Sequence, residues 1–87
     1  MSNYNFILTD EMQMKIEDAI YTNTQELYYD DLVDIFIRQQ YPERSVEAII
    51  NNYLDEPSIE KYNNDFRELQ NYRKACKLYA KQLLEMN

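Results

Sequence analysis

Three aspartates close together are the first residues in this chain that could do chemistry. Two of them are four residues apart, so they share one face if the segment is helical, and a tyrosine and two further acids lie nearby. Carboxylates grouped in this way can bind a divalent cation, imitate nucleic-acid phosphates or dock on a basic protein surface. The candidate partner-binding residues are Tyr28, Asp30, Asp31, Asp34, Glu43 and Glu47.

A metal site is the least favoured of these interpretations. The calcium-binding loop of an EF-hand needs a glycine at its sharp turn, and the chain contains no glycine. Di-metal sites in helical bundles typically use a Glu-x-x-His pair, and the chain contains no histidine. We therefore expect no metal and no cofactor. A solvated helix face and a docking surface remain as interpretations of the acidic residues.

The residue types also argue against catalysis. The absence of histidine removes the commonest general base and excludes Ser-His-Asp and Cys-His arrangements. The absence of glycine removes phosphate-cradling loops and the dinucleotide-binding fingerprint. Cys76 is the only cysteine, so it cannot form an internal disulfide, which fits a reducing compartment. We expect no catalytic residues and no enzymatic activity.

Positive charge is concentrated in the last third of the chain. Residues 1–60 have a formal charge of −10, whereas residues 61–87 have a formal charge of +3. The bases of this last part include a basic stripe in which Arg67, Lys74 and Lys81 are spaced by seven and Lys77 lies alongside. Such a stripe can follow a phosphate backbone, complement a helix dipole or pair with acidic helices. The net charge of −7 argues against direct nucleic-acid binding, since the acidic part would repel it.

Apolar residues recur three and four positions apart over most of the chain, which predicts one all-α domain over residues 1–87. We expect a small bundle of three short helices and one long C-terminal helix. The predicted helices cover residues 10–22, 24–40, 45–55 and 57–86. Residues 1–8 form an N-terminal arm, in which Tyr4, Phe6 and Leu8 alternate as in an extended segment lying on a helical surface.

Local signals predict where the helices begin. Thr9 or Asp10 can cap the first helix. Asn23 opens a capping box for the second helix, and Ser45 is a good N-cap for the third. Pro57 ends the third helix and suits the first turn of the fourth.

The length of the last predicted helix raises the question of what covers it. About 45 Å of straight helix would overhang a compact domain with a radius of gyration near 12 Å. The helix either packs along the three shorter ones or pairs with a second copy, unless it breaks near Asn71. We favour pairing, because an overhang would expose apolar surface. The expected dimer or secondary interface consists of Tyr72, Cys76, Tyr79 and Leu83.

Tyrosine is unusually common, with nine residues in the chain. Tyrosine gives a large contact area and a hydroxyl at low entropic cost, so it is enriched at protein interfaces. Tyr28, Tyr41 and Tyr79 lie nearer polar faces and are the better interface candidates. Five others are expected to fill or border the core, namely Tyr21, Tyr29, Tyr53, Tyr62 and Tyr72.

These features together favour a small binding protein. No apolar run approaches the roughly 20 residues of a membrane span, and the first residues show no basic region followed by an apolar stretch of the secretory-signal type, so we expect the cytoplasm. In size and composition the chain resembles the short, acidic, tyrosine-rich proteins with which phages and other mobile elements disable host proteins. We expect a non-catalytic module that binds a basic protein surface and inhibits a host nucleic-acid-acting protein of defence or transcription. A homodimeric assembly protein and an immunity or antitoxin-type protein are the alternatives.

Overall fold

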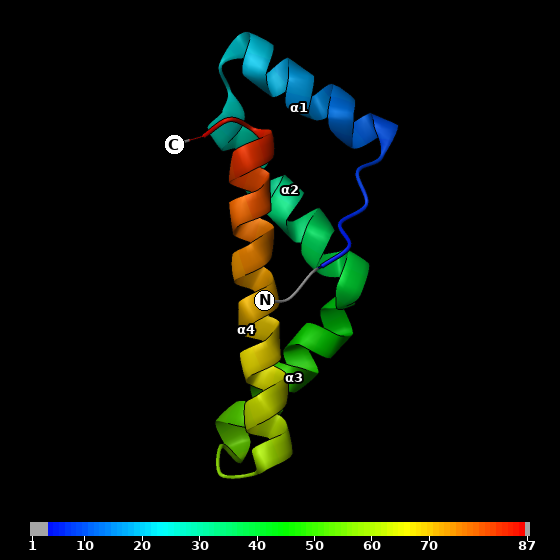
Figure 1. The fold of residues 1–87 in the computed structure, drawn as a ribbon. Helices are drawn as coiled ribbons and strands as arrows, with labels where there is room; N and C mark the ends of the chain where they lie inside the picture. Colours follow the sequence, from blue (N-terminus) through cyan, green and yellow to red (C-terminus); the bar gives the residue numbers. More distant parts are fainter. Residues whose placement is uncertain (1–3, 87) are drawn as a thin grey trace.

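The computed structural model describes residues 4–86, and these residues form four α-helices (Figure 1). No strand occurs within this described part, so the predicted all-α class is confirmed. The helices are α1 (Asp10–Thr22), α2 (Gln25–Gln40), α3 (Glu43–Asp55) and α4 (Glu60–Leu83).

The long helix α4 is the axis of the molecule. Its 24 residues give a length of about 36 Å. Helix α2 packs along its C-terminal half, α3 packs along its N-terminal half, and α1 lies on α2 (Figure 1). The molecule measures 48 × 26 × 22 Å and has a radius of gyration of 14.9 Å, so it is elongated. Because α2 and α3 together cover α4, the overhang that favoured a dimer does not arise.

The end of α1 differs from its prediction in one respect. Helix α1 has the predicted bounds, and the Thr9 hydroxyl accepts a hydrogen bond from the Met12 amide at 3.3 Å. Asn23 adopts the left-handed conformation (φ 58°), and the next amide, that of Thr24, donates to the Ala19 carbonyl. Asn23 therefore closes α1 rather than capping α2, because asparagine tolerates left-handed dihedrals better than most residues do.

The bounds of α3 and α4 also differ from those predicted. The Pro42 carbonyl accepts from the Ser45 and Val46 amides, so α3 begins at Glu43 and Ser45 lies inside it. Pro57 lies in the turn before α4 instead of in its first turn. Helix α4 ends at Leu83, where a left-handed Glu85 (φ 54°) turns the chain back.

The core lies between α2 and the C-terminal half of α4, with α1 and the arm against it. Its buried members are Met12, Ile16, Ala19, Leu32, Val33, Phe36, Tyr72, Cys76, Ala80 and Leu84. One polar contact crosses it, in which the Tyr72 hydroxyl donates to the Phe36 carbonyl at 2.6 Å. Burial raises the pKa of Tyr72, and burial raises the pKa of the Cys76 thiol to about 11. Both groups are therefore neutral at physiological pH.

The described part of the arm, residues 4–9, lies on the helices with Tyr4, Phe6 and Leu8 half-buried and the residues between them exposed, as the alternation predicted. The Phe6 ring stacks on Tyr79 with centroids 4.7 Å apart and contacts Phe36 at 5.2 Å. The side-chain amide of Gln39 accepts a hydrogen bond from the Ile7 amide (3.0 Å) and donates one to the Ile7 carbonyl (2.7 Å). Residues 1–3 of the predicted arm lie outside the described part. The Tyr4 ring meets Tyr72 edge-on with centroids 4.9 Å apart, so the arm is fixed on α2 by its backbone and on α4 by two rings.

The residues assigned to a dimer interface lie mainly in the core of the single chain. Tyr72 is 2% exposed and Cys76 is fully buried, both facing α2. Tyr79 stacks on Phe6, and Leu83 is half-buried against the core. Tyr72 and Cys76 are thus buried against α2 of the same chain, and pairing of α4 with a second copy stays a prediction.

The two halves of the molecule are packed unequally. Helix α3 contains no fully buried residue, although its apolar face is the most regular in the chain. That face has only α4 to pack against, and its closest aromatic contact is the Tyr53–Phe66 stack, with centroids 4.0 Å apart. The buried core therefore belongs mainly to the half that contains α1, α2 and the arm.

The hydroxyl of Tyr72 provides a first test of this core. We expect Tyr72→Phe to lower the free energy of unfolding by about 1 kcal/mol, because it keeps the ring and removes a buried hydrogen bond. Tyr21→Phe is the matched control, since that ring is 90% exposed, and it should change stability by less than about 0.5 kcal/mol. Urea titration followed by circular dichroism measures both, and equal values for the two variants would contradict the role given to Tyr72.

The same core predicts a loss of stability at alkaline pH. In the unfolded chain Cys76 and Tyr72 lose their protons near their ordinary pKa values of 9.0 and 10.0, whereas in the folded protein both values are raised. The unfolded state therefore releases protons first as the pH rises, so stability is full below about pH 8 and falls between about pH 9 and 11. Urea titrations across this range should show a shallower decline for Tyr72→Phe than for the wild type. An equal decline would contradict the expectation.

The arm is tested by removing its ring. Phe6→Ala should cost about 2 kcal/mol of stability, because a half-buried aromatic ring loses its contacts and leaves a gap. Gln39→Ala should cost about 1 kcal/mol, since two exposed hydrogen bonds to the arm are lost. Ile7→Ala is the control on the same segment, because its side chain is 63% exposed. A loss for Phe6→Ala no greater than that for Ile7→Ala would show that the arm adds nothing to the core.

Candidate functional site

The outward side of α2 carries a row of exposed carboxylates. Asp30, Asp31 and Asp34, which we call the acidic row, are all exposed. They lie on the side of the helix away from its buried residues, Leu32 and Phe36. Because the apolar face is held by α4 and the arm, the acidic row can only face solvent or a partner.

The turn between α2 and α3 brings two more acids to the end of this row. The chain bends at Tyr41 and Pro42 and α3 continues along α4 from the end of α2, so the first turn of α3 follows directly on the last turn of α2 (Figure 1). A pocket of about 260 Å³ forms where α2, α3 and α4 meet. We call it the junction pocket, and it is lined by Asp34, Ile37, Arg38, Tyr41, Glu43, Val46, Glu47 and Arg73. The structure thus brings together three of the predicted partner-binding residues.

The charges around the junction pocket are only partly compensated. An Arg38 guanidinium nitrogen lies 3.0 Å from an Asp34 carboxylate oxygen, and both side chains are more than half exposed, so this ion pair is worth only about 0.3–0.5 kcal/mol. Among residues 4–86 no ion pair involves Asp30, Asp31, Glu43 or Glu47. Arg73 also lines the pocket, so the five carboxylates of the row and pocket face two arginines and the surface keeps a formal charge of −3, which a basic partner can use.

Tyr41 gives the junction pocket an aromatic wall. Its ring is half-buried and lies 5.4 Å from that of Tyr72. Burial raises the pKa of Tyr41, and the carboxylate of Glu68 raises it further. The phenol is therefore neutral at physiological pH. It can exchange hydrogen bonds with a ligand, and its ring can contact a cation.

Tyr28 lies away from the junction pocket. It is in the first turns of α2, about 18 Å along the helix from Gln40. Its hydroxyl donates to the Asp18 carboxylate at 3.1 Å, which raises the pKa of Tyr28 and joins α2 to α1. Tyr28 is half-buried against the core. The structure therefore groups the acidic residues without the tyrosine that the sequence placed beside them.

Exposed apolar residues near the acidic row were missed from the sequence. Leu27 is 75% exposed and lies three and four residues before Asp30 and Asp31, on the same side of α2. The sequence held one signal of this exposure, because Leu27 does not share the helical face of Leu32 and the other buried residues of α2. Tyr21 was expected to border the core but is 90% exposed. Tyr79 was an interface candidate but stacks on the arm.

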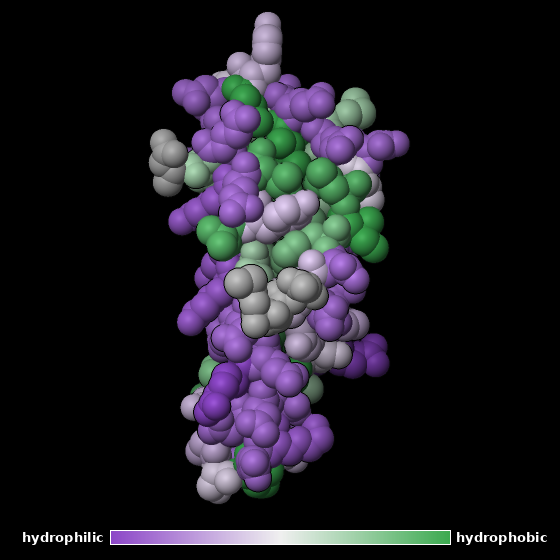
Figure 2. Space-filling model, viewed as in Figure 1, coloured by the Kyte–Doolittle hydropathy of each residue, from purple (hydrophilic) through white to green (hydrophobic). Residues whose placement is uncertain are grey.

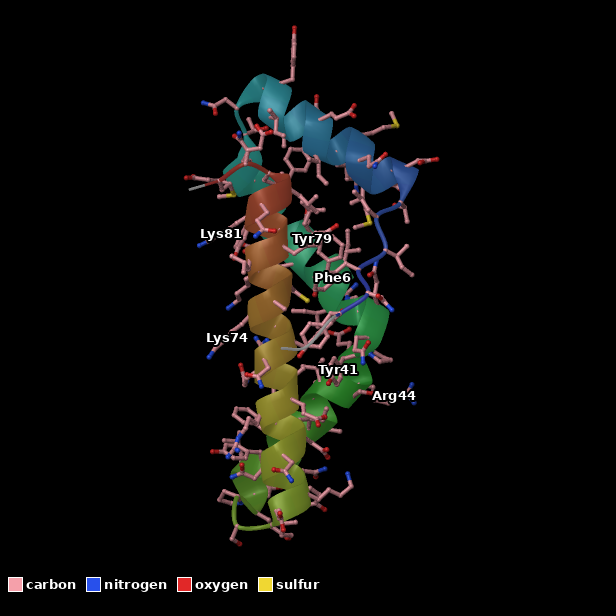
Figure 3. The ribbon with its side chains drawn as sticks, viewed as in Figure 1. Phe6, Tyr41, Arg44, Lys74, Tyr79 and Lys81 are labelled. Carbon is pink, nitrogen blue, oxygen red and sulfur yellow. The ribbon has the colours of Figure 1, made fainter. Side chains whose placement is uncertain are left out.

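The basic stripe lies on the other side of the molecule. Arg67, Lys74, Lys77 and Lys81 are all exposed, whereas the buried residues of α4 face α2. Figure 3 shows Lys74 and Lys81 pointing away from the molecule, while Tyr79 and Phe6 point inward. Hydrophilic side chains predominate in the lower half of Figure 2, where the N-terminal half of α4 lies, and hydrophobic ones gather between α4 and α1. The structure thus separates acids and bases by side as well as by sequence.

Two further findings concern the described residues alone. No three of their acidic or cysteine side chains come together in an arrangement that could hold a metal ion. Within the same residues, 4–86, no helix combines the length and the apolar character that crossing a membrane requires.

Comparison with known proteins gives this chain no relatives. No family model, curated protein or solved structure matches it. The case for a function therefore comes from the acidic row, the junction pocket and the basic stripe themselves.

Proposed function

We propose that this protein is a non-catalytic module that binds a basic surface of another protein through the acidic row and the junction pocket. One observation carries the proposal. A line of exposed carboxylates on α2 runs into a pocket that α3 lines with two further carboxylates. A lysine- or arginine-bearing surface is the natural complement of such a line.

In the proposed mechanism, different residues set the rate of association and the rate of dissociation. Uncompensated carboxylates raise the rate of association with a basic partner, by an amount that falls as salt is added. A lysine or arginine side chain of the partner enters the junction pocket, where Glu43 and Glu47 pair with its charge and Tyr41 contacts it with its ring. Leu27, exposed beside the acidic row, supplies apolar contact that slows dissociation.

A basic surface of this kind is what nucleic-acid-acting proteins present to phosphates. Covering it with carboxylates would block nucleic acid from binding, so the proposed role is stoichiometric inhibition of such a protein in the cytoplasm, as phage and mobile-element inhibitors do. An immunity or antitoxin-type protein would use the same surface on a basic toxin. A homodimeric assembly protein has less support, because α2 already covers the apolar stripe of α4.

The acidic row is tested with a defined basic probe. Asp30→Asn, Asp31→Asn and Asp34→Asn together should weaken binding of a fluorescent lysine 20-mer by at least about tenfold at 50 mM salt, since each contact to a basic partner is worth about 0.5–1 kcal/mol there. Fluorescence anisotropy measures the affinity. Wild-type affinity should fall steeply between 50 and 300 mM salt.

A second triple variant removes the same charge elsewhere. Asp55→Asn, Glu56→Gln and Glu60→Gln neutralise three exposed acids around the turn between α3 and α4. This control should change affinity by less than about threefold, because its residues lie beyond a Debye length from the acidic row. Both variants should keep wild-type stability within about 1 kcal/mol, since all six side chains are exposed. Equal weakening by the two variants would show that total charge, and not this surface, binds the probe.

A further inference from the structure

The outward face of α4 carries a second charged surface. Arg67, Lys74, Lys77 and Lys81, which we call the basic face, are all exposed. Residues seven apart on a helix share a side, so Arg67, Lys74 and Lys81 follow one another at about 10 Å and span about 21 Å. Figure 3 shows Lys74 and Lys81 reaching away from the helix on the same side.

The cations of the basic face are not used inside the chain. Within the described range 4–86, no ion pair involves any of its four residues. The Arg67 guanidinium donates to the neutral side chain of Asn63 at 3.1 Å, which orients it without cancelling its charge. Glu68 is the one acid between Arg67 and Lys81, and it lies near Tyr41, on the side toward α2. By the same seven-residue spacing, Glu60 lies on this side before Arg67, so the positive charge of the face extends from Arg67 to Lys81.

The net charge of −7 does not decide what the basic face attracts. The molecule is 26 and 22 Å across its two shorter axes, whereas charges in physiological salt are screened within about 8 Å. The acidic row lies on the outward side of α2, on the opposite side of the bundle from the basic face of α4. A ligand on the basic face is therefore separated from these aspartates by two or more screening lengths. The net negative charge of the chain therefore gives little repulsion of a nucleic acid that is bound at the basic face.

The uncharged residues of the face indicate the class of partner. Asn64, Gln70 and Asn71 lie among the cations, and Leu78 is the large apolar side chain exposed there, at 60%. Protein interfaces generally need buried aromatic or apolar anchors. Phosphate contacts need Lys, Arg, Asn and Gln side chains alone. We propose that the outward face of α4 binds the phosphate backbone of a nucleic acid.

This surface is independent of the acidic row, because the two lie on opposite sides of the bundle. Each can be tested, and can fail, without the other. Both can also be occupied at once, so the protein could hold a nucleic acid while it covers a basic protein.

The test uses a fluorescent 20-base-pair duplex and a 20-nucleotide single strand of mixed sequence. Anisotropy of the full chain should show binding at 50 mM salt that weakens roughly 100-fold by 200 mM for the duplex, since four phosphate contacts give a log–log slope of about −3.6. For the single strand the slope should be about −2.8. Absence of binding to both probes at 50 mM salt would overturn the proposal.

Matched variants decide where the nucleic acid binds. Arg67→Gln, Lys74→Gln and Lys81→Gln together should reduce the slope for the duplex by about 3 and abolish most of the binding. Lys15→Gln, Arg44→Gln and Lys61→Gln remove the same charge from exposed positions outside the basic face and should leave the slope unchanged. Circular dichroism confirms that both variants are folded. Equal loss in the control overturns the proposal, and so does tighter binding of labelled polyglutamate than of the duplex, which would assign the face to an acidic protein.

Discussion

The packing of α2 on α4 is the contact on which the rest of the structure depends. Phe36 and Tyr72 meet at its centre, where the Tyr72 hydroxyl fixes the rotation of one helix against the other by donating to a backbone carbonyl. Once this contact is made, the direction in which the opposite face of each helix points is fixed. The carboxylates of α2 then face one side of the molecule and the cations of α4 face the other. The arm completes the arrangement, because Phe6 fills the space between Phe36 and Tyr79.

The fold class and the helices were predictable because they follow from local spacing. Apolar residues three and four apart give helices, and no glycine interrupts them. The helix ends were less predictable because one residue type can serve either end. Asn23 could cap α2 or close α1, and its left-handed conformation shows that it closes α1. Ser45 lost its predicted role because the Pro42 carbonyl already accepts the first amides of α3.

The candidate site was predictable in its residue types but not in its grouping. The acids on α2 were found from sequence because charge and exposure go together. Their junction with Glu43 and Glu47 depends on the bend at Tyr41 and Pro42, which the spacing of residues does not describe. The burial of Tyr72 and Cys76 against α2 was missed for a similar reason. An apolar stripe shows that something covers it, and periodicity cannot say whether the cover is α2 of the same chain or a second copy. Tyr79 was likewise misplaced because its partner, Phe6, is far away in sequence.

The separation of charges lowers the stability of the single folded chain, which supports the proposal that the charged surfaces meet partners. The ion pairs among residues 4–86 all join residues four apart on one helix, so none links two helices. Like charges one turn apart, such as Asp30 with Asp34 and Lys77 with Lys81, each destabilise a helix by about 0.2–0.5 kcal/mol. Alternating the two signs on the same exposed faces would replace this repulsion with attraction and leave the core unchanged. This unfavourable charge pattern occurs on two opposite sides of a chain whose core is small. Functional surfaces are where a sequence is expected to depart from the charge arrangement that would best stabilise the fold.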